Sequence, residues 1–174
     1  FGLATFLVAD AMTFAGFFAA YLTFKAVNPL LPGAVYELEL PLPTLNTILL
    51  LVSSATFHRA GVNLRRSDMQ RCRRWLLLTA VLGLAFLVSQ MVEYFTLPFG
   101  LTDNLYASTF YALTGFHGLH VTLGALMILI VWWQCRTPEG RVSADNHFPL
   151  EAAELYWHFV DGIWVVLFVI LYLI

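Results

Sequence analysis

Acidic side chains lie inside long apolar stretches of this sequence, where they could store or exchange protons. Asp10 lies within the apolar run 2–26, and Asp161 lies near the middle of the run 152–174. Glu93 lies within a turn of the outer end of the run 74–97. An ionised carboxylate is costly in hydrocarbon unless it is protonated, paired or hydrated. These three acids are therefore candidates for proton handling, and the alternative for each is a neutral acid that hydrogen-bonds to a neighbouring helix.

A second group of polar residues follows one helical stripe at the end of the chain. Glu151, Glu154, His158 and Asp161 are separated by three, four and three positions, which places them on one face of a helix. Acids and an imidazole on one stripe can form a buried hydrogen-bond network or a short proton relay.

Two further histidines lie in the uncharged run 105–134. His117 shares a helical face with small and hydroxyl-bearing residues, and His120 lies close to that face. Small and hydrogen-bonding residues mark the contact surface of a membrane helix. The spacing of the two rings favours hydrogen bonds to neighbouring groups over chelation of a metal ion. The expected buried polar network comprises His117, His120, His158, Gln90, Glu154 and Asn46.

The elements that must position these residues are membrane helices. The sequence is 60% hydrophobic and 11% charged, whereas soluble domains are nearer half apolar and about a quarter charged. The net charge is −2, so the sequence lacks the strong positive charge that is typical of nucleic-acid-binding proteins. Cys72 and Cys135 suggest neither a disulfide framework nor a thiolate metal site. We therefore expect one all-α domain over residues 1–174, with five transmembrane helices at about 2–26, 45–61, 74–97, 105–134 and 152–174.

The basic residues predict the orientation of this bundle. Eight of the nine lie in or beside the second and fourth connections, which places those connections in the cytoplasm. The N-terminus is then cytoplasmic and the C-terminus outside. The long Pro-rich first connection suggests that helices one and two splay from helices three to five, with lipid in the groove between them. Candidates for contact with lipid headgroups are Arg59, Arg65, Arg66, Glu151 and His58.

The motifs in these helices resemble one known family. The runs Tyr106–His120 and Glu151–Trp164, the Gln90-x-x-Glu93-Tyr94 pattern and Leu45-Asn-Thr47 are similar to subunit III of the haem-copper oxidases. The order of the motifs also agrees with that family. Asp10 departs from it, because subunit III proteins usually carry Glu at this place, in a setting linked to proton handling.

The resemblance implies an accessory role without a redox centre. A subunit III packs against the catalytic subunit I, beside subunit II, binds phospholipid, and supports proton uptake and durability during reduction of O2 to water. Haem and copper would lie in those partner subunits, with none bound by this chain. The likeness is to the short, five-helix bacterial form of the multi-pass subunit, in the plasma (inner) membrane. Because Phe1 already lies in an apolar run, we expect that a native start is missing and that this run is a helix.

Three alternatives stay open at the level of the sequence. A haem-binding electron carrier could use His158 with His117 or His120 as axial ligands. A proton-coupled transporter could use the three buried acids, although no inverted repeat is visible. Within the resembling family, subunit III of a quinol oxidase is the alternative to a cytochrome c oxidase.

Overall fold

The computed structural model describes residues 2–27, 40–103, 105–136, 142–143 and 146–173. These residues form an all-α bundle, which confirms the predicted fold class. The Pro-rich connection 28–39 and Arg141 lie outside the described residues. The elements are α1 (Gly2–Val27), α2 (Pro41–Arg65), α3 (Met69–Thr96), α4 (Leu105–Gln134), α5 (Phe148–Phe168) and the π-helical segment η2 (Val169–Leu173).

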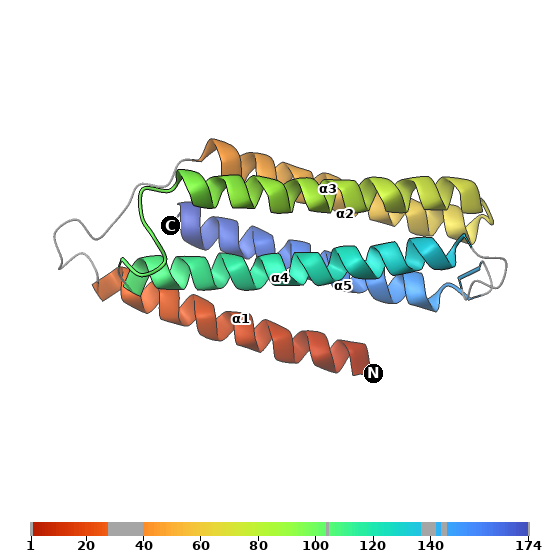
Figure 1. Cartoon of the computed structure of the whole chain (residues 1–174). Helices are drawn as coiled ribbons and strands as arrows, with labels where there is room; N and C mark the ends of the chain where they lie inside the picture. Colours follow the sequence, from red (N-terminus) through yellow and green to blue (C-terminus); the bar gives the residue numbers. More distant parts are fainter. Residues whose placement is uncertain (1, 28–39, 104, 137–141, 144–145, 174) are drawn as a thin grey trace.

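Four of the five helices in the described residues are long and apolar enough to cross a bilayer. They are α1, α3, α4 and the continuous α5–η2 segment. α2 is also long, because its 25 residues extend about 37 Å. It is less apolar, however, because it carries buried polar side chains such as Asn46 and Ser53. Figure 1 shows α2 running alongside α3 within the bundle.

Three helices begin earlier than their apolar runs predict. α2 begins at Pro41 rather than 45, α3 at Met69 rather than 74, and α5 at Phe148 rather than 152. Proline fits the first turn of a helix, where its missing N–H would have no intrahelical partner, and both α2 and α5 have one there. Asp68 caps α3 by accepting a hydrogen bond from the backbone N–H of Arg71 at 3.0 Å. Proline in the first turn of α2 and α5, and the Asp68 cap of α3, therefore account for the earlier starts.

The helices alternate in direction along the bundle axis. The α2–α3 turn and the end of α4 lie at the same end of the bundle as the N-terminus, and the C-terminus lies at the other (Figure 1). Neighbouring contacts join α2 to α3, α3 to α4, α4 to α5, and α5 back to α2, so these four form a closed bundle. α1 packs on the outside, against α4 and α5.

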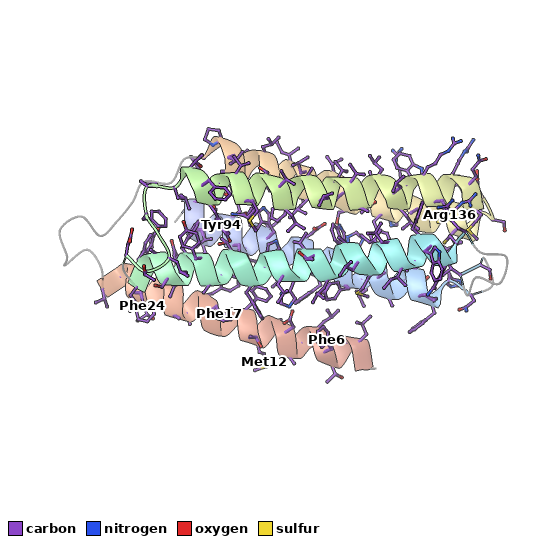
Figure 2. All side chains as sticks on the ribbon, in the orientation of Figure 1. Phe6, Met12, Phe17, Phe24, Tyr94 and Arg136 are labelled. Atoms are coloured by element: carbon purple, nitrogen blue, oxygen red, sulfur yellow. The ribbon has the colours of Figure 1, made fainter. Side chains whose placement is uncertain are left out.

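This arrangement differs from the expectation that helices one and two stand apart together. In the described residues α2 is part of the four-helix bundle, because its polar face packs against α3 and α5. Only α1 is peripheral. Its buried residues form a single line of Leu7, Phe14 and Tyr21, one every seven positions. Figure 2 shows Phe6 and Met12 on α1, and both side chains are largely exposed.

The indole of Trp157 lies at the centre of the bundle. It is fully buried on α5, and its ring lies against the backbone of Gly83 on α3 and Gly124 on α4. A Cβ at either glycine would lie within 2.7 Å of an indole carbon. These two positions need glycine because the helices approach the ring so closely.

Candidate functional site

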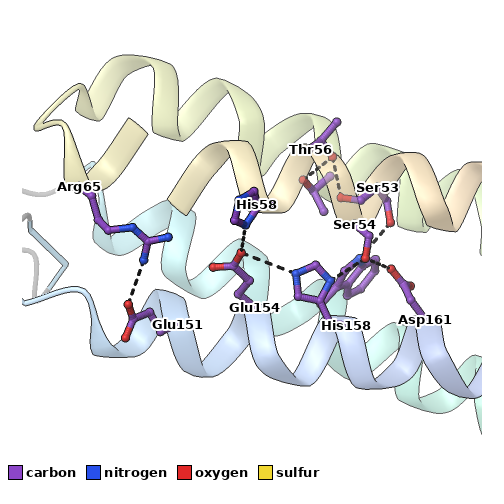
Figure 3. A network of polar contacts seen from close by, with 11 residues as sticks. Ser53, Ser54, Thr56, His58, Arg65, Glu151, Glu154, His158 and Asp161 are labelled. Atoms are coloured by element: carbon purple, nitrogen blue, oxygen red, sulfur yellow. Dashed lines mark hydrogen bonds and ion pairs between the residues drawn. The ribbon is translucent and has the colours of Figure 1, made fainter. Parts of the chain in front are cut away.

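Polar side chains form a continuous row along the contact between α2 and α5, which we call the polar seam (Figure 3). At the end of the bundle that carries the N-terminus, the guanidinium of Arg65 donates to Glu151 at 3.0 Å. Both side chains are about half exposed. One turn further in, Glu154 Oε1 lies 3.1 Å from His58 Nδ1 and 3.6 Å from His158 Nε2. The carboxylate of Glu154 therefore lies between two imidazoles.

The polar seam continues to a buried carboxyl group. Ser54 donates its hydroxyl proton to Asp161 Oδ2 at 2.6 Å. The Oγ atom of Ser54 also lies 2.6 Å from His158 Nδ1. While Asp161 is ionised, the single proton of the Ser54 hydroxyl goes to Asp161, so His158 Nδ1 is then the donor in its contact with Ser54. His158 Nε2 then faces Glu154, so one further proton can be shared between this imidazole and that carboxylate.

The seam joins exposed imidazoles to buried carboxyl groups. The side chains of His58 and His158 are 64% and 40% exposed, that of Glu154 is 12% exposed, and Asp161 is buried. The contacts thus lead from the outer surface of the bundle to an acid in its interior. Acids and imidazoles joined by hydrogen bonds can pass a proton by successive short transfers, and the 3.6 Å contact between Glu154 and His158 would have to shorten for such a transfer. An arrangement of this kind has the chemistry of a short proton relay, or of a polar contact that holds two helices together.

Neighbouring bonds fix the backbone positions of the seam. Trp157 Nε1 donates to Ser53 at 2.9 Å, and Trp164 Nε1 donates to Thr47 at 3.0 Å. Glu154 approaches α2 closely at Gly61, where a Cβ would lie 3.0 Å from its second carboxylate oxygen. The two indole bonds therefore hold α5 in register with α2.

A second polar contact joins the peripheral helix α1 to α4. Asp10 Oδ1 lies 3.2 Å from His120 Nε2, and His120 Nδ1 lies 2.7 Å from the carbonyl oxygen of Phe116. The Asp10 and His120 side chains are 10% and 7% exposed. The aromatic rings of Phe14 and Phe116 cover the imidazole edge-on.

The hydrogen bonds of His120 determine how this pair handles a proton. A carbonyl oxygen only accepts, so His120 Nδ1 carries a hydrogen. In a neutral ring Nε2 is then an acceptor, and Asp10 must be the protonated acid that donates to it. In the charged ring Nε2 donates, and Asp10 is the carboxylate. The pair therefore holds one proton between them, which can lie on either partner.

The third predicted acid, Glu93, lies at the opposite end of the bundle from the basic turns. Tyr172 of η2 donates to Glu93 Oε1 at 2.7 Å, and the amide of Gln90 donates to Oε2 at 3.0 Å. The carboxyl group of Glu93 is buried and holds η2 against α3. Nearby, Tyr94 and Thr114 join α3 to α4 through their hydroxyls at 2.8 Å.

His117 and Asn46 differ from the expectation that they belong to a polar network. Both are fully buried, and neither side chain has a hydrogen-bond partner among the described residues. The ring of His117 packs instead on Trp164, with centroids 5.0 Å apart, and edge-on against Phe86. The helical face was predicted correctly, but the large aromatic side chains of α3 and α5 fill the space around the ring.

The structure thus assigns the predicted polar residues to separate groups. Glu151, Glu154, His158 and Asp161 face α2 together, as their spacing predicts, and His58 and Arg65 join them. Arg59 lies over the ring of Trp75, and Arg66 is exposed in the α2–α3 turn. Among the described contacts no path links Asp10, Glu93 and Asp161.

Comparison with known proteins identifies the family that shares these features. The family model described as cytochrome c oxidase subunit III matches residues 1–174. The chain belongs to the cytochrome c oxidase subunit III family. It is 51% identical to cytochrome c oxidase subunit 3 of Synechocystis sp., over 100% of this chain and 75% of that protein. It is 44% identical to cytochrome c oxidase subunit 3 of Thermostichus vulcanus, over 99% of this chain and 86% of the relative.

The similarity extends to animals. The chain is 36% identical to cytochrome c oxidase subunit 3 of Bos taurus, over 99% of this chain and 68% of the bovine protein. The resemblance predicted from the motifs is therefore confirmed. As a member of the subunit III family, this chain is an accessory subunit of an oxidoreductase complex and a multi-pass membrane protein. Within the described residues, no group of three or more His, Cys, Asp or Glu side chains is arranged to hold a metal ion.

Sequence reasoning missed several residues of these subunit III sites. Ser54 links His158 to Asp161, yet a serine in an apolar helix reads as ordinary packing. Its position four residues before His58, on the same face, was a usable signal. Tyr172 carried no comparable signal, because its partner Glu93 lies 79 positions away in the sequence.

Proposed function

We propose that this chain is the non-redox subunit III of a bacterial cytochrome c oxidase that reduces O2 to water and translocates protons. The observation that carries the proposal is the family match over residues 1–174, with 51% identity to one named subunit 3. In this role the chain packs against subunit I, beside subunit II, in the plasma membrane. Those partner subunits hold the haem and copper. The three relatives are subunits of cytochrome c oxidases, which favours cytochrome c over quinol as the electron donor.

The Asp10–His120 pair supports a part in proton uptake. The pair is almost fully buried, holds one proton between its partners, and joins the peripheral helix α1 to α4. A proton store of this kind can buffer a neighbouring uptake pathway without carrying out redox chemistry. The polar seam is the second candidate, because it connects an exposed imidazole to the buried Asp161.

A lipid-binding role is supported by the position of α1. This helix contacts the bundle along one line of buried residues and leaves side chains such as Phe6 and Met12 exposed. Acyl chains that fill the space beside α1 would stabilise its packing in the complex. In this role Arg59 and Arg66, near the α2–α3 turn, would contact lipid phosphates at the membrane surface.

The decisive experiment purifies the complex through an affinity tag on this chain. We expect haem-bearing and copper-bearing subunits to co-purify, with an oxidase spectrum and cytochrome c-dependent oxygen uptake. Metal analysis of the separated chain should find no stoichiometric haem or copper. A chain that purifies without haem-bearing subunits, or that carries its own haem, would overturn the proposal and favour a transporter or an electron carrier.

A second measurement tests the accessory character of the subunit. Oxidase prepared without this chain should still reduce O2, with slower proton uptake and a shorter lifetime during turnover. Complete loss of oxygen reduction in an otherwise intact subunit I–subunit II complex would contradict a purely accessory role.

A further inference from the structure

A hollow of about 270 Å³ lies on the membrane-facing contact between α3 and α4. It is lined on α3 by Gln90, Met91 and Tyr94, and on α4 by Gly115, Gly118 and Thr122, among others. Figure 2 labels Tyr94 on this part of α3, near the α3–α4 connection. None of the described residues that line the hollow is charged. This space, which we call the α3–α4 hollow, therefore suits a neutral group.

The lining of the hollow includes a hydrogen-bond acceptor that has no donor. Gln90 is 2% exposed, and its amide nitrogen donates to Glu93 Oε2 at 3.0 Å. The carbonyl oxygen of the same amide, Oε1, is buried and has no hydrogen-bond partner among the described residues. Native proteins rarely leave a buried acceptor unpaired. An unpaired acceptor on a residue that lines a hollow indicates a ligand with a donor.

The hydroxyl groups around the hollow have already used their protons within the chain. Thr122 donates to the carbonyl oxygen of Gly118 at 2.8 Å, and Thr114 donates to that of Phe110 at 2.8 Å. Because the Thr114 proton is used in this way, Tyr94 is the donor in its 2.8 Å contact with Thr114. The hydroxyl oxygens of Thr122 and Tyr94 can still accept. The hollow therefore offers several acceptors to a ligand that carries more than one donor.

The hollow continues into an apolar groove along the same contact between helices. This groove, of about 260 Å³, shares Leu87 and Thr122 with the hollow. Its floor includes Ala80 and Ala125, and it extends along α3 as far as Leu77. From Leu87 to Leu77 is ten residues of helix, or about 15 Å. A ligand with its polar head in the hollow can therefore extend an apolar tail along the groove.

The walls of the hollow suit a flat ring. An added Cβ would find its nearest atom 3.8 Å away at Gly115 and 3.9 Å away at Gly118, so α4 presents open backbone to this space. On α3 the hollow is lined by the exposed thioether of Met91 and the phenol ring of Tyr94. Thioether and aromatic groups make favourable contacts with an aromatic ring.

We propose that the α3–α4 hollow binds the reduced ring of a membrane quinol, whose apolar tail lies along the groove. A quinol has two ring hydroxyls, and these are the donors that the hollow lacks. One of them donates to Gln90 Oε1, which a small rotation of the amide brings to the surface of the hollow.

The same chemistry rejects two other membrane molecules. The oxidised quinone has the same outline as the quinol, but its carbonyl oxygens only accept, so it would leave Gln90 unpaired. A phosphate headgroup also brings acceptors, and its negative charge would lie near the carboxyl group of Glu93. The hollow therefore distinguishes the reduced ring from the oxidised ring and from a phospholipid.

The inference does not rest on the proposed oxidase role, because it concerns binding to this chain and not turnover. A site that oxidises quinol in a partner subunit would place labels on that partner rather than on α3 and α4.

The test uses the intact complex purified through this chain and placed in phosphatidylcholine nanodiscs without oxygen. The probe is a benzoquinol with a decyl tail that carries a diazirine close to the ring, and labelled peptides are mapped by mass spectrometry. We expect labels from the reduced probe to concentrate on residues 87–94 and 115–122. The oxidised probe should label these peptides about fivefold less, which corresponds to one lost hydrogen bond of about 1 kcal/mol.

Two variants locate the site. Gln90→Met keeps the length of the side chain but removes the acceptor, so the reduced and oxidised probes should then label equally. Tyr172→Phe is the matched control, because it removes the other hydrogen bond of Glu93, outside the hollow, and should keep the difference between the probes. Gly118→Leu fills the hollow and should reduce labelling by both probes. Gly16→Leu, at an open position of α1, should not.

Four results would overturn the proposal. One is equal labelling by the two probes in the parent complex, and another is equal labelling of all membrane-facing helices, which indicates non-specific contact only. A difference between the probes that persists in Gln90→Met would mean that Gln90 does not bind the ring. Protection of both peptides from both probes would mean that a protein subunit covers the hollow. None of these results would affect the subunit III assignment, which co-purification tests independently.

Discussion

At the scale of single residues, the aspartates Asp10 and Asp161 differ in the groups that could take up their protons. Asp10 faces an imidazole nitrogen directly, at 3.2 Å, so a proton can move between acid and base in one step. Asp161 faces the hydroxyl of Ser54, and the imidazole of His158 lies beyond that hydroxyl. Transfer to Asp161 needs the serine to exchange its own proton. We therefore expect Asp10, rather than Asp161, to be the acid that exchanges a proton with its neighbour.

Asp10→Asn tests this role. The amide keeps the size of the side chain and can donate to His120 Nε2, but it cannot release a proton. We expect assembly of the complex to persist, while proton uptake or lifetime in turnover falls severalfold, measured as oxygen uptake and protons translocated per electron. Asp103→Asn, in the exposed α3–α4 connection, is the control and should behave as the parent chain. Unchanged turnover, pumping ratio and lifetime in Asp10→Asn would leave Asp10 with a packing role only.

The depth of Asp10 could be predicted from the sequence, but its partner could not. Position within an apolar run indicates burial of an acid. The choice of His120 over His117 depends on which side of α4 the helix α1 covers. Only the packing of the bundle determines that side, because Asp10 and His120 lie 110 positions apart in the sequence.

At the scale of elements, α5 is joined to its neighbours by polar bonds on one side and by close packing on the other. The seam to α2 contains hydroxyl, imidazole and carboxyl groups, which compensate for the lower apolarity of α2. Towards α3 and α4, glycines allow the helices to approach the indole of Trp157. In the sequence the stripe of Glu151 to Asp161 indicated one polar face. Nothing in it indicated that α2, rather than α3 or α4, would lie opposite.

Ser54→Ala tests the polar side of α5. The change removes the donor to Asp161 and the acceptor for His158, and leaving a buried polar group without its partner costs about 1–3 kcal/mol. We expect the purified complex to lose subunit III at a lower temperature, measured by size-exclusion chromatography after heating. Ser89→Ala is the matched control. The Ser89 hydroxyl is buried without a partner among the described residues, so its removal should be nearly neutral.

Gly83→Ala and Gly124→Ala test the packed side. In each variant the new methyl group would lie within 2.7 Å of a Trp157 ring carbon, and overpacking of a core costs about 1–3 kcal/mol. In the same heating assay, both variants should lose subunit III from the complex at a lower temperature than the parent chain. Gly162→Ala on α5 meets nothing within 4 Å and should be tolerated. Equal stability of all three variants would mean that the indole can move aside.

At the scale of the whole molecule, the bundle gathers its basic residues at one end. The α2–α3 turn and the end of α4 lie together there, so Arg65, Arg66 and Arg136 come from connections far apart in the sequence (Figures 1 and 2). The apolar runs were sufficient to predict the helices and, through the charge of their connections, this clustering. They could not predict that α2 joins the four-helix bundle, because that depends on the fit of polar side chains between helices.

The clustering leads to a prediction of orientation in the membrane. Lys and Arg are retained on the cytoplasmic side, so the end with Arg66 should be cytoplasmic and the α3–α4 connection with Thr102 should be outside. The 28 residues of α3 between these ends extend about 42 Å, enough to cross a bilayer including its headgroups. Arg66→Cys and Thr102→Cys provide one exposed thiol at each end. The native Cys72 and Cys135 are buried and should give little background.

A membrane-impermeant maleimide then reports the side on which each thiol lies. In intact cells freed of their outer envelope we expect Thr102→Cys to be labelled and Arg66→Cys to be protected. In inverted membrane vesicles the pattern should reverse, and detergent should expose both. The parent chain measures labelling of the native cysteines. Labelling of Arg66→Cys from outside would invert the orientation, and labelling of both thiols from one side would mean that α3 does not cross the bilayer.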